Sequence, residues 1–146
     1  MKRILFVCTG NTCRSPMAEA ILKSKNLPGV EVKSAGVFAT NGSAASSHTK
    51  KVLTENQISS VHQSRALSEQ EIDWASVILT MTASHKAAVL SYFPHAVEKT
   101  FTLSEFAGGG VQGDIADPYG GTIENYRVSF EEIKNAIERS ASKWNQ

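Results

Sequence analysis

The start of the chain constrains the fold more than any other part of the sequence. Residues 3–7 form an apolar run after a basic start, the pattern of a strand buried on both faces. A polar loop follows. Ser15 and Pro16 then suit the N-cap and the first position of a helix, which the helix formers MAEAILKSK continue. A buried strand that leads through a short loop into a helix predicts a parallel sheet covered by helices.

The rest of the chain repeats this alternation. Pro28 and Gly29 break the chain, and residues 30–36 (VEVKSAG) alternate as a second strand. Residues 68–71 (SEQE) have the pattern of a capping box that opens a short helix towards Trp74. The other expected elements are strands at residues 77–81 and 100–103, helices at residues 46–56 and 83–93, and a long last helix whose apolar face holds Ile123, Tyr126, Phe130, Ile133, Ile137, Ala141 and Trp144.

Alternating strands and helices imply right-handed crossovers and a parallel sheet with helices on both faces. Such sheets bind ligands beyond the carboxyl ends of their strands, where the strand order reverses. If the first strand is central, this point lies directly after Val7, and Cys8 stands there. The candidate site is therefore the loop that begins at Cys8.

The loop from Cys8 to Ser15 has the composition of an anion-binding loop. Five residues between Cys8 and Arg14 suffice to wrap the backbone around one tetrahedral anion. The helix N-terminus adds partial positive charge, Gly10 supplies freedom for a tight turn, and Asn11 tolerates left-handed geometry. The residues expected around the anion, besides Cys8 and Arg14, are Thr9, Gly10, Asn11, Thr12, Cys13 and Ser15.

Three of these side chains fit one reaction. Arg14 offers a planar fork that matches two phosphoryl oxygens. In the positive surroundings of the loop a thiol ionises readily, so Cys8 is predicted to be a nucleophilic thiolate near neutral pH. Ser15 can donate a hydrogen bond to that thiolate and help it leave. The loop therefore predicts a cysteine nucleophile that attacks a phosphoryl group.

Other interpretations of the loop fit less well. A Walker loop is excluded because no Gly-Lys-Ser or Gly-Lys-Thr follows, and two cysteines with four scattered histidines lack the spacing of a zinc site. We therefore expect no metal and no cofactor. Cys13 has two interpretations: a small buried residue, or a redox partner that traps oxidised Cys8 as a disulfide.

A phosphatase of this kind also needs an acid that protonates the leaving atom. Asp117, in the segment DIADPYGG, lies on a glycine-rich loop after the fourth strand, and Pro118 restrains its backbone. An ordinary turn residue is the alternative interpretation of Asp117. Asp114, in the same segment, is the competing carboxylate.

The composition and the net charge limit the classes of partner that the protein is expected to bind. The chain is 41% hydrophobic and 20% charged, which fits one globular domain over residues 1–146. Lys and Arg number 15 and Asp and Glu 14, for a net charge of +1, so no basic field for nucleic acid or a membrane surface is expected. The first apolar run is too short for a signal peptide or a membrane span. We expect a cytoplasmic, monomeric protein.

At CTGNTCRSP (residues 8–16) and DPYGG (residues 117–121) the sequence resembles the low-molecular-weight protein tyrosine phosphatases, essentially from end to end. The resemblance implies a three-layer α/β/α fold with a four-stranded parallel sheet, Rossmann-like or flavodoxin-like, and no metal. It implies Cys8 as nucleophile, Arg14 as phosphate binder, and Asp117 as a general acid that later acts as base. The residues that match the loop-supporting hydrogen-bond network of the family are Asn11, Ser15, Ser34 and His62.

Two positions depart from the tyrosine phosphatases of this family. Thr12 replaces an aliphatic residue and Gly120 an aromatic one, which removes an apolar wall and a stacking face for a phenyl ring. The hydroxyl of Thr12 and the charge of Asp117 suit a guanidinium and a P–N bond. The pattern also resembles the bacterial protein-arginine phosphatases, so the expected substrate is phosphoarginine in proteins, with phosphotyrosine as the alternative. The expected wall residues are Phe38, Thr40 and Tyr119.

Two more distant classes share this fold or loop. Arsenate reductases relay oxidation through further cysteines, and no cysteine follows Cys13. A non-catalytic module that binds phosphoproteins would resemble this sequence in everything except turnover. The joint presence of Cys8, Arg14, Ser15 and Asp117 favours an enzyme.

Overall fold

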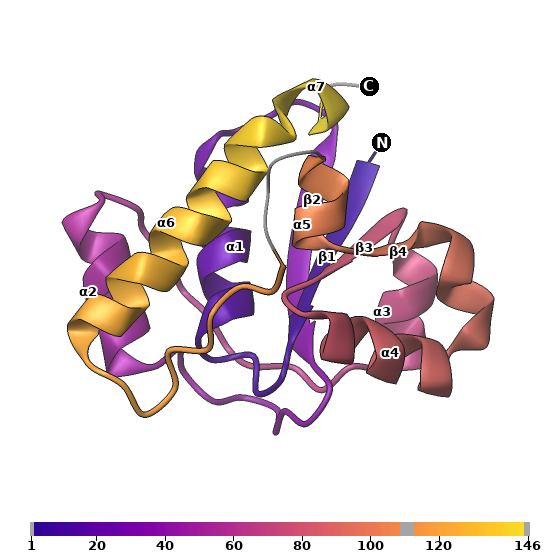
Figure 1. The fold of residues 1–146 in the computed structure, drawn as a ribbon, viewed down its shortest axis with the longest axis horizontal. Helices are drawn as coiled ribbons and strands as arrows, with labels where there is room; N and C mark the ends of the chain where they lie inside the picture. Colours follow the sequence, from indigo (N-terminus) through magenta and orange to yellow (C-terminus); the bar gives the residue numbers. More distant parts are fainter. Residues whose placement is uncertain (1, 109–112, 145–146) are drawn as a thin grey trace.

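A computed structural model describes residues 2–108 and 113–144 of the chain. Four parallel strands form a sheet in the order β2-β1-β3-β4 (Figure 1). The strands are β1 (Lys2–Cys8), β2 (Val30–Gly36), β3 (Val77–Thr80) and β4 (Thr100–Thr102). The parallel sheet predicted from the alternation of elements is confirmed.

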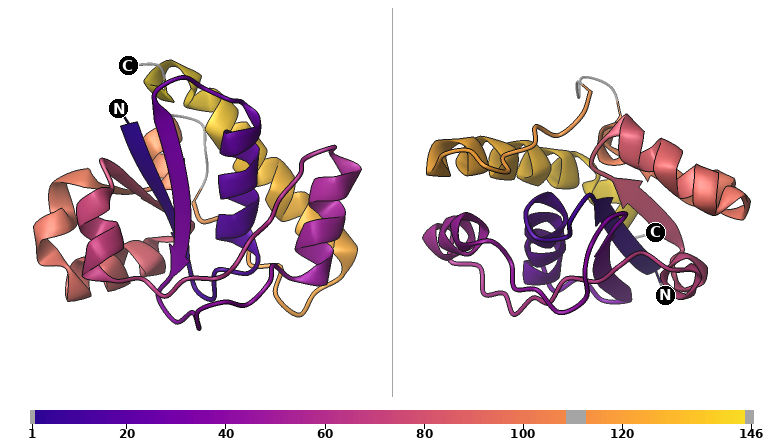
Figure 2. Two further views of the ribbon diagram at one scale, coloured as in Figure 1. Left: turned by 180° about the vertical axis from the view of Figure 1, so that it is seen from behind. Right: turned by 90° about the horizontal axis from the view of Figure 1, so that it is seen from below.

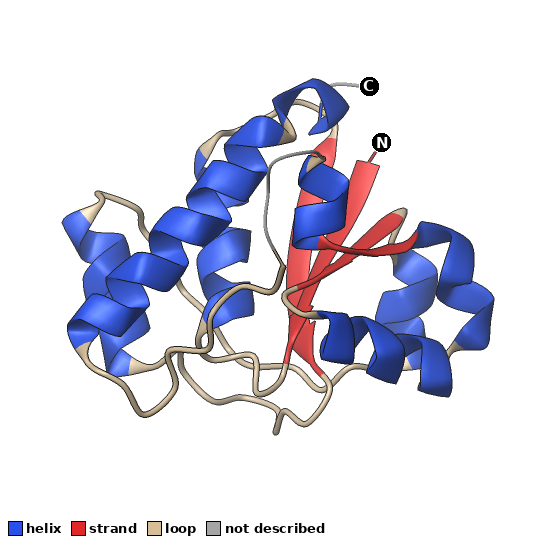
Figure 3. Ribbon diagram, viewed as in Figure 1, coloured by secondary structure: helices blue, strands red, loops and turns tan. Residues whose placement is uncertain are grey.

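The central place of β1 fixes the position of the site. β2 pairs with one side of β1, so that Cys8 faces Gly36, and β3 pairs with the other side. The chain therefore turns to one side of β1 first and to the other side next, and the strand order reverses at the carboxyl end of β1. Loops gather along this edge of the sheet (Figure 3). Cys8, the last residue of β1, lies at the predicted point.

Helices lie on both sides of the sheet (Figure 2), which confirms the three-layer arrangement. One side holds α1 (Arg14–Ser24), α2 (Ser47–Glu55), α5 (Leu103–Ala107), α6 (Ile123–Arg139) and α7 (Ala141–Trp144). The other side holds α3 (Glu69–Trp74), α4 (Ala83–Tyr92) and the 3₁₀ helix η1 (Pro94–Lys99). Among the described residues, no helix has both the length and the apolar character that crossing a membrane requires.

Residues 4–7 of β1 are apolar without interruption because both faces of the strand are covered there. Ile4 and Phe6 belong to the core that includes residues of α1 and α6, whereas Leu5 and Val7 belong to the core that includes residues of α3 and α4. All four side chains are fully buried. Successive side chains of a strand point to opposite faces, so a strand between two helical layers is apolar at every position.

The start of α1 differs from the expected one. α1 begins at Arg14, with Cys13 at the N-cap and no side-chain cap, so Ser15 and Pro16 are its second and third residues. The prediction of Ser15 as the N-cap is wrong, because its hydroxyl contacts Cys8 and Asn11 instead. The hydroxyl that sequence reasoning assigns to helix capping therefore belongs to the loop.

Three other local predictions need correction. Ser68 is the N-cap of α3, but its hydroxyl donates to the carboxylate of Glu71 and makes no hydrogen bond to the backbone of the helix. The fourth strand ends at Thr102, because Thr102 and Glu105 form the capping box of α5, a helix that was not predicted. The last helix is interrupted at Ser140, whose hydroxyl bonds to a carbonyl of the preceding turn.

Gly36 is the point where β2 and the loop after β1 come into close contact. A Cβ atom at Gly36 would lie 2.4 Å from the carbonyl oxygen of Thr9 and 2.9 Å from the amide nitrogen of Asn11. Gly36→Ala is therefore expected to displace the loop and to lower the free energy of unfolding by about 1–3 kcal/mol, measured by urea unfolding. Gly10→Ala is the control, because the nearest atom to its Cβ is Oγ1 of Thr12 at 3.8 Å. An equal loss in both variants would contradict this account.

Candidate active site

The loop after β1 and the segment before α6 form a pocket of about 290 Å³. The two segments are far apart in the sequence and meet at the carboxyl edge of the sheet. The lining residues are Cys8, Thr9, Gly10, Thr12, Cys13, Arg14, Asp117 and Tyr119. All eight are residues that the sequence assigns to the site.

Asn11 does not line the pocket but holds the loop in shape. Its Nδ2 donates to Oγ of Ser15 (2.8 Å) and to Oγ of Ser34 (2.9 Å), and its Oδ1 accepts from the backbone N–H of Arg65 (2.9 Å). Its carbonyl oxygen lies 2.7 Å from Nε2 of His62. Asn11 is fully buried, so these bonds are protected from water. The supporting residues predicted from the family resemblance therefore meet at one residue, Asn11: Ser15 and Ser34 at its side chain and His62 at its backbone.

Asn11, rather than Gly10, supplies the left-handed turn of the loop. Asn11 has a φ of 57°, whereas Gly10 is not among the residues with positive φ. Asn is one of the few residues with a side chain that adopts this conformation readily. The backbone freedom predicted for Gly10 is therefore not what the loop uses.

The backbone of the loop presents donors that have no protein acceptor. Within the described part of the chain, the N–H groups of residues 10–13 donate to no acceptor. The first turn of α1 carries no acidic side chain that would compete for an anion. Free backbone N–H groups and a helix N-terminus together bind anions well. The loop therefore has the features of an anion site.

Cys8 and Arg14 lie at this anion site and are both buried. Sγ of Cys8 lies 2.8 Å from Oγ of Ser15, close enough for the hydroxyl to donate to a thiolate. Nη1 of Arg14 donates to the carbonyl oxygen of Ile115 (2.9 Å), and Nη2 lies 3.7 Å from Oδ2 of Asp117. Arg14 therefore links the loop to the segment that carries the candidate acid.

The structure separates the two candidate acids. Asp117 lines the pocket, and its Oδ1 accepts the backbone N–H of Tyr119 (3.0 Å). Asp114 lies outside this pocket, because its Oδ1 accepts the backbone N–H of Ala83 (2.8 Å), the first residue of α4. Asp117 is therefore the carboxylate placed near Cys8, and Asp114 anchors the segment to α4.

Thr12 and Cys13 are neighbouring residues of the pocket lining. Cys13 is buried, and its Sγ lies 3.4 Å from Oη of Tyr126. Burial and this contact with Cys13 raise the pKa of Tyr126 to about 12, so its phenol stays protonated at neutral pH. Cys8 and Cys13 are both free thiols. The interpretation of Cys13 as a buried residue is confirmed, and a disulfide with Cys8 stays a prediction.

The predicted wall residues divide into two groups. Tyr119 lines the pocket, and its side chain is largely exposed. Phe38 and Thr40 are not among the lining residues. The backbone N–H of Phe38 donates to the carbonyl oxygen of Thr9 (2.9 Å), and the hydroxyl of Thr40 lies 3.3 Å from that of Ser43. Phe38 therefore supports the loop through its backbone.

Glu19 is a supporting residue that the sequence did not reveal. It accepts a hydrogen bond from the hydroxyl of Ser34, and its Oε1 lies 3.6 Å from Nδ1 of His62. Burial favours the neutral carboxyl, but hydrogen bonds from His62, Lys23 and Ser34 outweigh it and lower the pKa of Glu19 to about 2. The charged carboxylate therefore fixes Ser34 and His62, two of the residues that bind Asn11. A glutamate in the middle of a helix carries no signal for this role.

His85 is the second residue missed in the sequence. It is the third residue of α4, and its Nε2 lies 2.8 Å from Oγ1 of Thr9. Burial lowers the pKa of His85 to about 4, and the positive charge of Arg14 acts in the same direction. His85 is therefore neutral at physiological pH.

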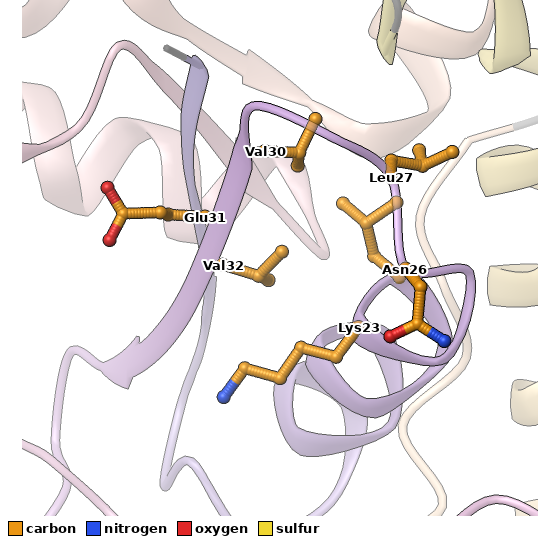
Figure 4. A pocket seen from close by; sticks show the side chains of 7 residues that line it. Lys23, Asn26, Leu27, Val30, Glu31 and Val32 are labelled. Atoms are coloured by element: carbon orange, nitrogen blue, oxygen red, sulfur yellow. The ribbon is translucent and has the colours of Figure 1, made fainter.

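A second hollow, of about 460 Å³, lies between the end of α1 and the first half of β2 (Figure 4). Its lining residues are Leu22, Lys23, Asn26, Leu27, Val30, Glu31 and Val32. Val30 and Val32 pair with the start of β1, whereas Gly36 pairs with Cys8 at the other end. The hollow therefore lies away from Cys8, and its lining holds no cysteine, histidine or hydroxyl side chain.

Comparison with known proteins agrees with this geometry. The model of the family described as low molecular weight phosphotyrosine protein phosphatase matches residues 3–146. A protein-arginine-phosphatase of Geobacillus stearothermophilus is 57% identical over 141 residues, which cover 97% of this chain and 95% of the relative. The low molecular weight protein-tyrosine-phosphatase PtpB of Staphylococcus haemolyticus is 40% identical, over 90% of this chain and 91% of the relative.

Solved structures show the same fold. The YwlE arginine phosphatase from Geobacillus stearothermophilus matches with a TM-score of 0.94 at 57% identity, over 98% of this chain and 92% of that one. A cysteine-to-serine mutant of YwlE arginine phosphatase with a phosphorylated active-site serine matches with a TM-score of 0.91 at 41% identity, over 97% and 94%. The fold and the cysteine loop define a cysteine-dependent phosphatase. The chain belongs to the low molecular weight phosphotyrosine protein phosphatase family.

The lowered pKa of Glu19 predicts how the free energy of unfolding depends on pH. The pKa of Glu19 in the folded protein is about 2 against an ordinary value of 4.5, so its contribution to stability is present above about pH 5 and is lost as the pH falls towards 2. Glu19→Gln should therefore lower the free energy of unfolding by about 2–3 kcal/mol at neutral pH, and this difference from wild type should shrink to near zero at about pH 2.

Urea unfolding of both proteins at several pH values measures the difference. The control is Glu31→Gln, because the pair of Glu31 with Arg3 is about half exposed and such pairs contribute little. A difference between wild type and Glu19→Gln that does not change with pH would refute the assignment.

Proposed function

We propose that this chain is a protein-arginine phosphatase that hydrolyses phosphoarginine through a cysteinyl-phosphate intermediate. The observation that carries the proposal is that Cys8, Thr12 and Asp117 line one pocket beside an anion loop. Their shared pocket supports the assignment of Cys8 as nucleophile and Asp117 as acid for one phosphoryl group, with the hydroxyl of Thr12 beside them. The likeness to proteins named protein-arginine phosphatases supports the same conclusion.

In the first step the thiolate of Cys8 attacks phosphorus. An S–P bond forms and the P–N bond breaks, while protonated Asp117 donates its proton to the leaving guanidinium nitrogen. The loop N–H groups and Arg14 bind the phosphoryl oxygens and stabilise the charge of the transition state. The relative with a phosphorylated serine in its active site supports a covalent intermediate of this kind.

In the second step water attacks the phosphocysteine. Asp117, now a carboxylate, takes a proton from the water, an O–P bond forms, and the S–P bond breaks to release phosphate. The electron pair returns to Cys8 as a thiolate, to which Ser15 donates a hydrogen bond at 2.8 Å. Cys8 and Asp117 therefore act in both steps, and neither step uses a metal.

The choice of phosphoarginine rests on the polarity of the pocket lining. A guanidinium carries only hydrogen-bond donors, so it needs acceptors around it. Thr12 offers its hydroxyl oxygen and the protonated carboxyl of Asp117 its carbonyl oxygen as acceptors, whereas the carbon atoms of a phenyl ring donate to neither. The second candidate is phosphotyrosine, because the exposed ring of Tyr119 at the pocket offers a stacking face and relatives named protein-tyrosine-phosphatases exist.

The proposal also includes where the enzyme works. A mechanism that needs a free thiol favours a reducing compartment, so the proposed location is the cytoplasm and the partners are phosphorylated proteins. Peroxide would oxidise a thiolate at Cys8, and a disulfide with Cys13 is the proposed protected form. We also propose that the enzyme acts as a monomer.

The two carboxylates of the segment before α6 can be told apart by kinetics. Asp117→Asn should lower the rate roughly 10²- to 10⁴-fold on poor leaving groups, the usual size of acid catalysis. The loss should be smaller on nitrophenyl phosphate, whose leaving group needs no proton. Asp114→Asn is the matched control and should keep the wild-type dependence on the leaving group, since Asp114 binds the N–H of Ala83. The reverse pattern would identify Asp114 as the acid.

Thr12 gives the test of the substrate. kcat/KM is measured on matched phosphoarginine and phosphotyrosine peptides for wild type and for Thr12→Ile. Wild type should prefer phosphoarginine, and Thr12→Ile should lose phosphoarginine activity and gain phosphotyrosine activity, because a polar contact is replaced by an apolar one. An aromatic residue at Gly120 is not a useful second change, because the φ of Gly120 is 77°. A wild type that prefers phosphotyrosine would leave the tyrosine phosphatase as the function.

A further inference from the structure

The mechanism above does not use the contact between Thr9 and His85. Oγ1 of Thr9 lies 2.8 Å from Nε2 of His85. Thr9 follows β1, and His85 stands at the start of α4, which follows β3. These are the two strands between which the strand order reverses. The contact therefore joins the two walls of the crevice in which the pocket lies.

Thr9 differs from the rest of the loop in its exposure. Its side chain is exposed and lines the pocket, whereas the buried residues of the loop are Cys8, Asn11, Cys13, Arg14 and Ser15. A phosphoryl group held by Cys8 has its leaving group on the far side of phosphorus, in line with the sulfur and towards the open side of the pocket. Thr9 is therefore the exposed loop residue nearest to this open side of the lining, and its hydroxyl is held there by His85 at 2.8 Å.

We propose that Thr9 is a specificity-determining residue whose Oγ1 accepts an N–H of the phosphorylated guanidinium, and that His85 is the positioning residue that fixes this hydroxyl. The inference rests on the proposed function and names a further contact to its substrate. It holds for both tautomers of His85. If Nε2–H donates to Oγ1, one lone pair of Oγ1 stays free, and if Nε2 accepts, both stay free. A tyrosyl ring offers no donor to this oxygen.

The surroundings of His85 indicate that its imidazole has a role at Nε2. The side chain is buried, and within the described part of the chain its Nδ1 has no hydrogen-bond partner. An unpaired buried nitrogen destabilises the fold, whereas an apolar side chain would fill the same space without that cost. The neutral ring also does not repel a cationic leaving group, since Arg14 and burial oppose its protonation more than Asp114 and Asp117 favour it.

The test compares kcat/KM on matched phosphoarginine and phosphotyrosine peptides for wild type, Thr9→Val and Thr9→Ser. Thr9→Val keeps the shape of the side chain and removes the acceptor. It should lose roughly 10- to 100-fold on phosphoarginine, the usual effect of one hydrogen bond to a charged group, and should lose much less on phosphotyrosine. Thr9→Ser retains a hydroxyl and should stay close to wild type. Equal losses of Thr9→Val on both peptides would overturn the proposal.

Inhibition by inorganic phosphate separates the leaving group from the phosphoryl oxygens. The inhibition constant of phosphate should be the same for Thr9→Val and wild type, because the loop N–H groups and Arg14 bind phosphate without this hydroxyl. A phosphate inhibition constant that rises as far as phosphoarginine activity falls would show that Thr9 acts on the phosphoryl oxygens, and the proposal would be wrong.

A double-mutant cycle tests whether His85 acts through Thr9. His85→Leu should lower the ratio of phosphoarginine to phosphotyrosine activity when residue 9 is Thr, and should leave the ratio unchanged in the Thr9→Val background. His85→Gln, which can still bond to Oγ1, should recover part of the ratio. Equal effects of His85→Leu in both backgrounds would refute the positioning role. If urea unfolding shows that His85→Leu does not fold, the same cycle is measured with His85→Gln. An equal change of the activity ratio by His85→Gln in the wild-type and Thr9→Val backgrounds would then refute the positioning role.

The same data separate this inference from the proposed function. A wild type that prefers phosphotyrosine refutes both, because no guanidinium then reaches Thr9. A wild type that prefers phosphoarginine, together with an unchanged ratio in Thr9→Val, refutes the inference alone. A lowered ratio in Thr9→Val and a recovered one in Thr9→Ser support it.

Discussion

The hydrogen bonds of the buried Asn11 are the interactions on which the site depends. Its side chain connects the loop to α1 through Ser15, to β2 through Ser34 and to the backbone of Arg65. These bonds stabilise a left-handed residue in the middle of the loop. The hydroxyl that contacts Cys8 is thereby held by the same amide that shapes the backbone. The conformation of the loop and the surroundings of the Cys8 thiol therefore depend on one set of hydrogen bonds, which the carboxylate of Glu19 extends through Ser34.

The parts of the molecule that the sequence predicts are those encoded by neighbouring residues. The buried strand, the loop and the helix after it follow one another in the chain, so periodicity and turn residues suffice to predict the sheet and the place of Cys8. Arg14 lies in the same short loop as Cys8, so its place at the site also follows from the sequence alone. The segment with Asp117 was predicted from its glycines and proline, and the family resemblance favoured Asp117 over Asp114. The contact of Asp114 with Ala83, which lies 31 residues away in the sequence, adds a structural reason for that choice.

The residues that the sequence could not reveal act across long separations. Glu19 and His85 are ordinary helix residues in the sequence, and only packing brings them to Ser34, His62 and Thr9. The two wrong predictions in the loop, Ser15 as the N-cap and Gly10 as the left-handed residue, arose because another residue or another partner was available. A serine before a proline is a good N-cap, but a thiol and an amide nearby provide other partners for Ser15. A glycine in a loop suggests a left-handed turn, but Asn11 performs it.

The segment that carries Asp117 is attached to its surroundings through the three residues directly before Asp117. Asp114 binds the N–H of Ala83, the N–H of Ile115 donates to the carbonyl of Met81 (2.9 Å), and the carbonyl of Ala116 accepts from Ser129 (2.8 Å). A segment bonded to Met81 directly after β3, to α4 and to α6 does not have to fold over a substrate to bring its carboxylate into place. The conformational entropy that is lost when the carboxyl group of Asp117 is oriented is therefore lost once, during folding, and not again at each turnover. The substrate protein must therefore move instead: its phosphorylated side chain has to protrude far enough to enter a site that is already assembled.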